Sequence, residues 1–330
     1  MNIYDIAREA GVSIATISRV INGKDVVSPK TREKVEKVLA RYSYSPSEIA
    51  RGLVVNSMRT IGVMTIDIRD VYYAHVAYTI ERELSKQGYT VILCNTGGDT
   101  DEKAKYMKTL LQKKIDGIIL VGSVFTDEKL EAYIAEISES VPVVLVNGLV
   151  EADNVYCVVC DDSEGTASAI DYLVQKGHQR IVYFQNTDTF SARKKLEGFK
   201  DGLIRNRLEF SDEIVIKVSK GLEGGIEGVD SISSIVPEYS AILCSDDECA
   251  LGTVKRLCQL GIRIPEDAAV IGFNNSVFAR CCSPELTSID NKMDKMGLEA
   301  VKILTAAIYK HSNVERILLI KPELIIREST

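Results

Sequence analysis

Residue types that catalyse reactions or bind metals are few in this sequence and are not spaced for either task. The 330 residues include three histidines, at His75, His178 and His311. None of them has a partner at the spacing of a metal site or a catalytic triad. Acidic pairs at 161–162 and 246–247 follow strand-like runs, where such residues more often cap the next helix. We therefore predict no enzymatic activity, no metal and no cofactor.

Two further motifs have a chemical and a structural interpretation. Cys157 and Cys160 form a C-x-x-C pair, but a redox pair needs a helix N-terminus to lower the thiol pKa, and VYCVVC is typical of a buried strand. The glycine-rich segment GLEGGIEG (221–228) lacks the Lys-Ser/Thr of a phosphate loop and the G-x-G-x-x-G order. We interpret the cysteines as packing residues and the segment as a loop followed by a helix start.

Polar side chains near the N-terminus indicate recognition of nucleic acid instead. A helix running from about Ile14 to Ile21 would have Ser13 at its N-cap. Together with Thr16 and Ser18, this serine can offer hydroxyls and helix-end amides to phosphate groups. The sequence therefore predicts a helix end that contacts a phosphate backbone.

The outer face of the same helix carries the residues that could read bases. Ile14, Ala15 and Arg19 project from it. Arginine reads guanine with two hydrogen bonds, whereas isoleucine and alanine can only contact thymine methyl groups. The other residues that we assign to DNA contact in the helical head are Asn22, Ser28 and Thr31.

Three short helices must position these residues. Apolar positions recur at helical spacing in the first ten residues, Gly11 ends that helix, and Ser28-Pro29 opens a third helix after the second. This arrangement describes a helix-turn-helix, with a small buried helical hairpin as the alternative. Charge favours DNA binding, because residues 1–59 carry a net +4 while the whole chain carries −7.

The rest of the chain alternates apolar strands with helices. From Thr60 the run TIGVMTIDI is followed by a helix closed at Gly88, and similar units continue to VPVVLVN. The rhythm restarts at Ser163 and continues to AVIGFNN. Continuous apolar strands separated by helices indicate doubly wound parallel sheets, here in two lobes, and ligands bind such sheets at the carboxyl ends of the strands. The predicted fold class is α/β, with an all-α head before two such lobes.

Composition excludes other classes. The chain is 45% hydrophobic and 26% charged, as expected of a globular protein. No run approaches the roughly 18 apolar residues of a membrane helix, and the N-terminus MNIYDIAREAGVS lacks the pattern of a signal peptide. We therefore expect a cytoplasmic protein with no membrane partner.

Long stretches of the sequence resemble one known family. The segments IYDIAREAGVSIATISRVING and VSPKTREKVEKVLARYSYSPSEIARGL closely resemble the head of lactose-repressor (LacI) family regulators. The resemblance continues through KKIDGIILVGS, KGHQRIVYF, AILCSDDECALG, GIRIPEDAAVIGFNN and LIIREST, in order along the chain. It implies a transcription regulator that forms a homodimer or a larger assembly, a palindromic operator, and a periplasmic-binding-protein-like core that senses a small, carbohydrate-like effector.

The resemblance also implies the domain organisation. The expected parts are a helix-turn-helix head (1–45), a hinge (46–59) and an effector-binding core (60–330). Within the core, lobe 1 is expected at about 60–158 and 290–316, and lobe 2 at about 159–289 and 317–330. In such regulators the hinge becomes a minor-groove helix on DNA, with Leu53 entering a base step and Ala50 packing beside it.

Effector contacts are carried over position by position. Lys195 stands where the family has a pocket arginine, Asn147 and Asn274 stand where it has aspartates, and Asp246-Asp247 replaces Asn-Asp. Tyr73 occupies an aromatic position that flanks the ligand, Asn291 lies at a crossover, and Asp70-Val71-Tyr72 departs from the common Asn-Pro-Phe. The implied effector-binding residues are Tyr73, Asn147, Lys195, Asp246, Asn274 and Asn291. An ion pair between Lys195 and Asp246 is the structural alternative.

Two other function classes remain to be weighed. An extracytoplasmic solute-binding protein would have a similar core, but it would carry a signal peptide and no DNA-binding head. An enzyme acting on the same ligand would need catalytic groups that the sequence does not supply. The sequence leaves open the identity of the effector and whether it induces or corepresses. It also leaves open whether a phosphorylated carrier protein acts as corepressor. Because no leucine-heptad tail follows Thr330, we expect a dimer and not a tetramer.

Overall fold

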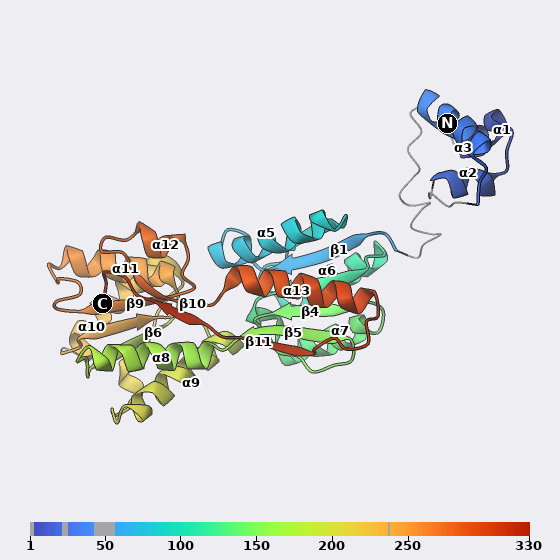
Figure 1. The fold of residues 1–330 in the computed structure, drawn as a ribbon. Coiled ribbons are helices and arrows are strands. Elements are labelled where there is room, and N and C mark those ends of the chain that lie inside the picture. Colours follow the sequence, from blue (N-terminus) through green and yellow to red (C-terminus); the bar gives the residue numbers. More distant parts are fainter. Residues whose placement is uncertain (1–2, 22–25, 43–56, 237) are drawn as a thin grey trace. The chain divides into compact units, whose positions relative to one another are not determined.

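The computed structural model describes residues 3–21, 26–42, 57–236 and 238–330. The chain divides into two compact units, 1–59 and 60–330, which we call the head and the core (Figure 1).

The head is a three-helix unit. Its helices are α1 (Ile3–Ala10), α2 (Ile14–Ile21) and α3 (Pro29–Arg41). Gly11, with φ +61°, ends α1, and the Val12 amide donates back to the Ala7 carbonyl at 3.1 Å. The fully buried Ile6, Ile17 and Val35 join the three helices in one small apolar core. This is the helix-turn-helix arrangement that the sequence predicts.

The core has two lobes, each built on a six-stranded sheet. Lobe 1 contains β1 (Thr60–Thr65), α5 (Val71–Lys86), β2 (Thr90–Asn95), α6 (Thr100–Gln112), β3 (Gly117–Val121), a 3₁₀ turn (Ser123–Phe125), α7 (Glu128–Ser138), β4 (Val143–Val146), β5 (Val155–Cys160), α13 (Met293–Ile308) and β11 (Ile317–Ile320). Its strands are all parallel, in the order β11-β5-β4-β3-β1-β2.

Lobe 2 repeats this plan. It contains α8 (Asp162–Gln175), β6 (Ile181–Gln185), α9 (Phe190–Arg205), a 3₁₀ turn (Asp212–Ile214), β7 (Val215–Lys217), α10 (Gly221–Ile235), β8 (Ala241–Cys244), α11 (Asp247–Gln259), β9 (Ala269–Phe273), α12 (Val277–Cys281), β10 (Thr287–Asp290) and β12 (Glu323–Ile325). The strand order is β12-β10-β9-β8-β6-β7, and only β12 runs antiparallel to its neighbour. The predicted fold class, an all-α head before two α/β lobes, is confirmed.

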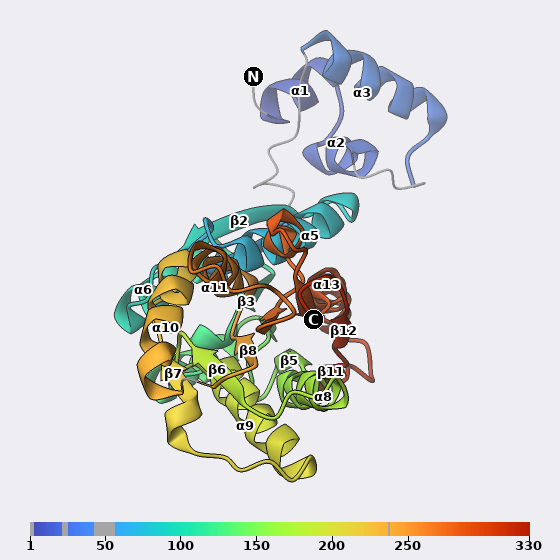
Figure 2. The same cartoon turned by 90° about the vertical axis from the view of Figure 1, so that its left-hand side faces the viewer.

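Each sheet is buried on both faces, which explains the continuous apolar strands. In β4, Val144 and Val146 pack under α5 and α13, whereas Val143 and Leu145 pack under α6 and α7. In lobe 2, α10 and α11 cover one face and α8 and α9 the other (Figures 1 and 2).

The chain crosses between the lobes three times, and one crossing differs from the sequence prediction. We expected residues 317–330 in lobe 2, but β11 lies in lobe 1, where it pairs with β5 in parallel. After α13 the chain is still in lobe 1, so the apolar run at 317–320 extends the sheet beside it. The third crossing therefore falls between Ile320 and Glu323, and only β12 reaches lobe 2.

An ionic cluster joins two of these crossings. Lys292 has a positive φ of +59° immediately before α13, and its Nζ contacts Asp290 Oδ2 at 2.8 Å and Glu323 Oε2 at 2.6 Å. Asp290 ends β10 and Glu323 begins β12, so one lysine connects the second crossing to the third.

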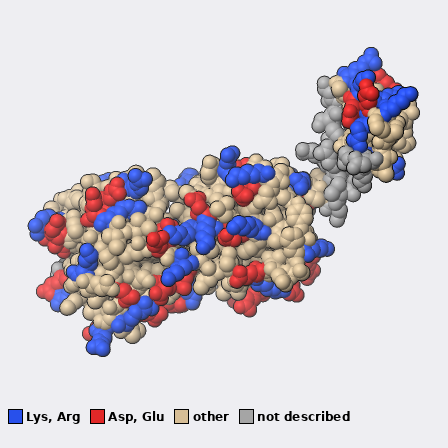
Figure 3. All heavy atoms as spheres, viewed as in Figure 1, with Lys and Arg blue, Asp and Glu red and all other residues tan. Residues whose placement is uncertain are grey.

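Surface charge is mixed on the core. Basic and acidic side chains are interspersed over the face shown in Figure 3. In the part of the chain that the structure describes, no helix is both long and apolar enough to cross a membrane.

Candidate functional site

The second helix of the head has a capped N-terminus and one buried face. The Ser13 side chain accepts a hydrogen bond from the Thr16 amide at 3.1 Å, and the two hydroxyls lie 2.9 Å apart. Ile17 and Val20 are buried against α1 and α3. The cap fixes where α2 begins, and the packing of Ile17 and Val20 fixes which face of α2 is turned outward.

That outer face presents the residues expected to read bases. Ala15 and Arg19 are exposed, Ile14 is 40% exposed, and Ser18 is half-buried. An apolar side chain this accessible contributes little to the head core, which leaves it free to contact a partner.

A second exposed cap lies at the start of α3. The Ser28 side chain accepts from the Thr31 amide at 3.3 Å, and the two hydroxyls lie 2.8 Å apart. The remaining predicted DNA contacts, at Asn22, Ala50 and Leu53, lie outside the residues that the structure describes.

A cavity of about 150 Å³ lies between the two lobes of the core. All six side chains that the sequence predicts as effector contacts line it: Tyr73, Asn147, Lys195, Asp246, Asn274 and Asn291. Most of them follow the carboxyl ends of strands, where doubly wound sheets place ligands. Other polar side chains of the lining were not predicted from the sequence, among them Asp70, Asn186, Ser191, Lys220, Ser245 and Glu248. Their position at strand ends and helix N-termini is the signal that could have identified them.

Lys195 is the buried cation of this cavity. It is 9% exposed, donates to the Ser245 carbonyl at 2.7 Å, and holds its Nζ 3.7 Å from the centre of the Phe273 ring. The structural alternative raised by the sequence, an ion pair with Asp246, is not what the lysine forms. Asp246 instead caps α11 by accepting from the Cys249 amide at 2.8 Å, and its second oxygen accepts from Asn186.

A buried carboxylate lies beneath the lysine. Asp162 is 2% exposed and accepts from Ser191 Oγ at 2.5 Å and from Asn147 Nδ2 at 3.4 Å. Burial raises the pKa of Asp162, while Lys195 and these hydrogen bonds oppose the rise. Of the acidic pair, Asp161 is the helix cap, accepting from the Glu164 amide at 3.1 Å, and Asp162 orients two lining side chains.

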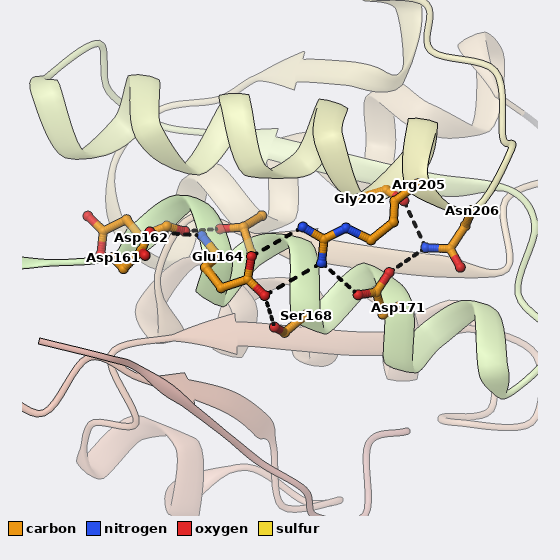
Figure 4. A network of polar contacts seen from close by, with 9 residues as sticks. Asp161, Asp162, Glu164, Ser168, Asp171, Gly202, Arg205 and Asn206 are labelled. Carbon is orange, nitrogen blue, oxygen red and sulfur yellow. Dashed lines mark hydrogen bonds and ion pairs between the residues drawn. The ribbon is translucent and has the colours of Figure 1, made fainter.

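The helices that carry these groups are fastened to each other. Arg205 on α9 reaches Glu164 at 3.2 Å and Asp171 at 3.0 Å on α8, and Asn206 donates to Asp171 at 2.5 Å (Figure 4). Because α8 supplies Asp162 while α9 supplies Lys195, this network holds the two charges in register.

A second buried carboxylate, Asp247, lies at the start of α11. Asp247 accepts from Ser288 Oγ at 2.5 Å and from the Ser276 amide at 2.6 Å. Burial raises its pKa to about 7, even though both hydrogen bonds act to lower it. Its hydrogen bonds tie the loop after β9 to the start of α11, so we assign it a positioning role.

Two asparagines of the lining are hydrogen-bonded to each other: Asn274 follows β9, and Asn291 lies where the chain passes from β10 to α13. Asn291 Nδ2 donates to Asn274 Oδ1 at 2.9 Å, and Asn274 has a positive φ of +99°. The side-chain oxygen of Asn291, Oδ1, is buried and has no hydrogen-bond partner among the described residues. A buried acceptor of this kind is costly unless a ligand or water satisfies it.

Aromatic side chains form an apolar wall in lobe 1. The rings of Tyr72 and Tyr73 meet edge to face, with centroids 5.3 Å apart. Gly122 is required here, because a Cβ at this position would overlap the Tyr73 ring. Burial raises the pKa of both tyrosines, so they face the cavity as neutral phenols.

The motifs with alternative chemistry have structural roles. Cys157 and Cys160 are buried in β5, and burial raises the pKa of both thiols. The glycine-rich segment lies entirely in α10, which begins at Gly221. The prediction of a loop there is wrong. Among the described residues, no three His, Cys, Asp or Glu side chains are grouped to hold a metal ion.

Family comparisons match both parts of the chain. Residues 2–47 match the model for bacterial regulatory proteins, lacI family. Residues 58–328 match the model for periplasmic binding proteins and the sugar binding domain of the LacI family.

Individual relatives match over their whole lengths. An HTH-type transcriptional regulator of Lachnoclostridium phytofermentans is 38% identical, covering 100% of this chain and 99% of the relative. The lac repressor dimer bound to operator and the anti-inducer ONPF matches with a TM-score of 0.87 at 25% identity, covering 100% and 99% of the two chains. The complex of the transcriptional regulator CelR with cellobiose matches with a TM-score of 0.75 at 26% identity, covering 100% of both.

Proposed function

This chain belongs to the lacI family of bacterial regulatory proteins, and from that premise we propose that it is a repressor controlled by a small, carbohydrate-like effector. Like its relatives, it is a transcription regulator that binds operator DNA, and it is not an enzyme. The finer proposal is a homodimer on a palindromic operator, supported by the match to an operator-bound repressor dimer.

One observation carries the effector proposal: amides, carboxylates and a lysine from both lobes line a single interlobe cavity. Sugars present hydroxyl groups that both donate and accept, and Asn147, Asp246 and Asn274 offer the complementary groups. At about 150 Å³ the cavity is below the roughly 300–1,000 Å³ of pockets for drug-sized ligands, which favours a single-ring effector. The match to a cellobiose complex supports the same chemical class.

The head proposal assigns base reading to α2. Arg19 would read a guanine in the major groove, and Ile14 and Ala15 would contact the neighbouring bases. The capped ends at Ser13 and Ser28 would hold phosphates. These contacts define one half-site, and a second copy of the chain would supply the other.

Replacing Arg19 by alanine should weaken binding to the cognate operator by about 1–3 kcal/mol and leave binding to random DNA almost unchanged. The reason is that a bidentate contact to a base is lost, not a general phosphate contact. Fluorescence anisotropy with both duplexes at one salt concentration measures the difference.

A charge-matched control separates these effects. Lys37→Ala removes one positive charge from α3, where the lysine is paired with Glu33 at 2.8 Å. It should lower the affinity for both duplexes slightly and equally. If Arg19→Ala also weakens both duplexes equally, Arg19 contacts only phosphate and the base-reading assignment is wrong.

A further inference from the structure

Carboxylates from both lobes line the exposed side of the interlobe cavity, which we call its mouth because Asp70 and Glu248 are exposed there. Asp70 caps α5 in lobe 1, while Asp246 and Glu248 lie at the start of α11 in lobe 2, and all three line the cavity. They interact electrostatically across the cleft. Partial desolvation and the charge of Asp246 raise the pKa of Asp70, and partial desolvation together with the charges of both aspartates raises the pKa of Glu248. Bringing the lobes closer would increase this repulsion.

The lysines of the lining offset this charge only in part. Lys195 is buried, donates to the Ser245 carbonyl and has its Nζ over the Phe273 ring. Lys220 lies next to α10 and is exposed, and its charge acts to lower the pKa of Asp70. At the mouth, three carboxylates therefore face a single lysine among the described lining residues.

Four lining residues, Tyr72, Ser245, Ser276 and Asn291, have a buried polar side-chain atom with no hydrogen-bond partner among the described residues. Among them, Ser245 and Asn291 are only 3% and 1% exposed. Buried polar groups are normally satisfied, so these two indicate a ligand that brings hydroxyl groups.

We propose that the effector is an amino sugar, with a protonated amine held between Asp70, Asp246 and Glu248 and ring hydroxyls at Ser245 and Asn291. The inference rests on the proposed effector cavity and specifies its ligand. An ammonium group offers three donors and a positive charge. Bound between carboxylates of opposite lobes, it would replace their repulsion with attraction and stabilise the closed cleft.

Calorimetry on the full chain tests the proposal with matched sugars. The probes are glucosamine, glucose and N-acetylglucosamine, with the same three forms of galactose and mannose, at about pH 6.5 so that the amines are protonated. In at least one series the amine should bind about tenfold or more tighter than both neutral forms, as one charge-assisted hydrogen bond provides.

Two outcomes would overturn the amine assignment. One is that no amine binds, and the other is that a neutral form binds as tightly as its amine. A neutral sugar whose binding is weakened by Asn291→Ala would leave the proposed effector cavity standing. A sugar whose binding is unaffected by Asn291→Ala and by Lys195→Met would overturn the cavity itself.

Conservative variants locate the amine. Asp70→Asn and Glu248→Gln should each reduce the preference for the amine over the neutral sugar by about tenfold. Asparagine also caps helices, so Asp70→Asn should preserve α5. Asp67→Asn is the control, because Asp67 bonds Arg69 at 2.7 and 2.9 Å and is not part of the lining. An equal preference in all three variants and the parent would contradict the assignment.

Discussion

Lys195→Met is expected to weaken effector binding by about 10–100-fold. This factor corresponds to the roughly 1.5–3 kcal/mol that a hydrogen bond to a charged group contributes. Methionine keeps much of the length of the buried side chain but removes its charge. The Ser245 carbonyl then loses its 2.7 Å donor, and Asp162 loses the cation that opposes the rise of its pKa. The floor of the cavity would change both its charge and its hydrogen bonds. Calorimetry with the ligand identified by the sugar panel measures the loss.

The neighbouring lysine provides a matched control. Lys194 lies on the same helix, its side chain is 43% exposed, and it pairs with Glu197 at 2.6 Å. Lys194→Met should leave effector affinity unchanged, because an exposed ion pair contributes little. If Lys195→Met binds the effector as tightly as the parent does, the lysine is only a structural cation.

Gly252→Ala is expected to destabilise the core by about 3 kcal/mol or more, at the upper end of overpacking effects. The backbones of α10 and α11 touch at this point. A Cβ on Gly252 would overlap the Leu222 carbonyl oxygen, and a Cβ on Gly225 would overlap the Cys249 carbonyl oxygen. Neither backbone can move aside without separating the helices. The midpoint of urea unfolding, followed by circular dichroism, should fall.

Gly98→Ala is the control for this substitution. Gly98 lies in an exposed loop, and a Cβ there would meet no atom within 4 Å. Its unfolding midpoint should match that of the parent. Equal midpoints for Gly98→Ala and Gly252→Ala would show that α10 and α11 can separate at little cost.

These glycines also show where sequence reasoning reaches its limit. Glycine in a helix interior costs about 1 kcal/mol relative to alanine, so the segment 221–228 indicated a loop with the helix near 226–235. In the structure α10 spans Gly221–Ile235. The glycines are there for close contact with α11, and that contact depends on a helix over twenty residues further along the chain.

The lobe boundary was missed for a related reason. Local pattern identifies ILLI at 317–320 as a strand, but which sheet it joins depends on where the chain stands after two earlier crossings. The local sequence determines that the segment forms a strand, but it does not determine which strand it pairs with. The alternating strand and helix pattern was sufficient for the fold class because burial on both faces leaves a continuous apolar signature.

The cavity was predictable in outline and not in detail. Tyr73, Asn147 and Lys195 could be placed because the sequence resembles LacI-family regulators position by position, and the doubly wound pattern placed the cavity at the carboxyl ends of the strands. The partners of these side chains could not be placed. Lys195 donates to the carbonyl of Ser245, the residue after β8. Asp162 is buried near this lysine because α8, which carries the aspartate, packs beside α9, which carries the lysine. Such contacts join residues distant in sequence, and no local spacing encodes them.

Occupancy of the interlobe cavity is expected to control operator binding. The most direct measurement is the operator affinity of the full chain by fluorescence anisotropy, with and without a saturating amount of the sugar that calorimetry identifies. Coupling of this kind is typically about 5–150-fold, so the parent should show a change of at least fivefold in either direction. Lys195→Met should show a smaller change at the same sugar concentration. If the parent has the same operator affinity with and without bound sugar, the cavity does not control operator binding.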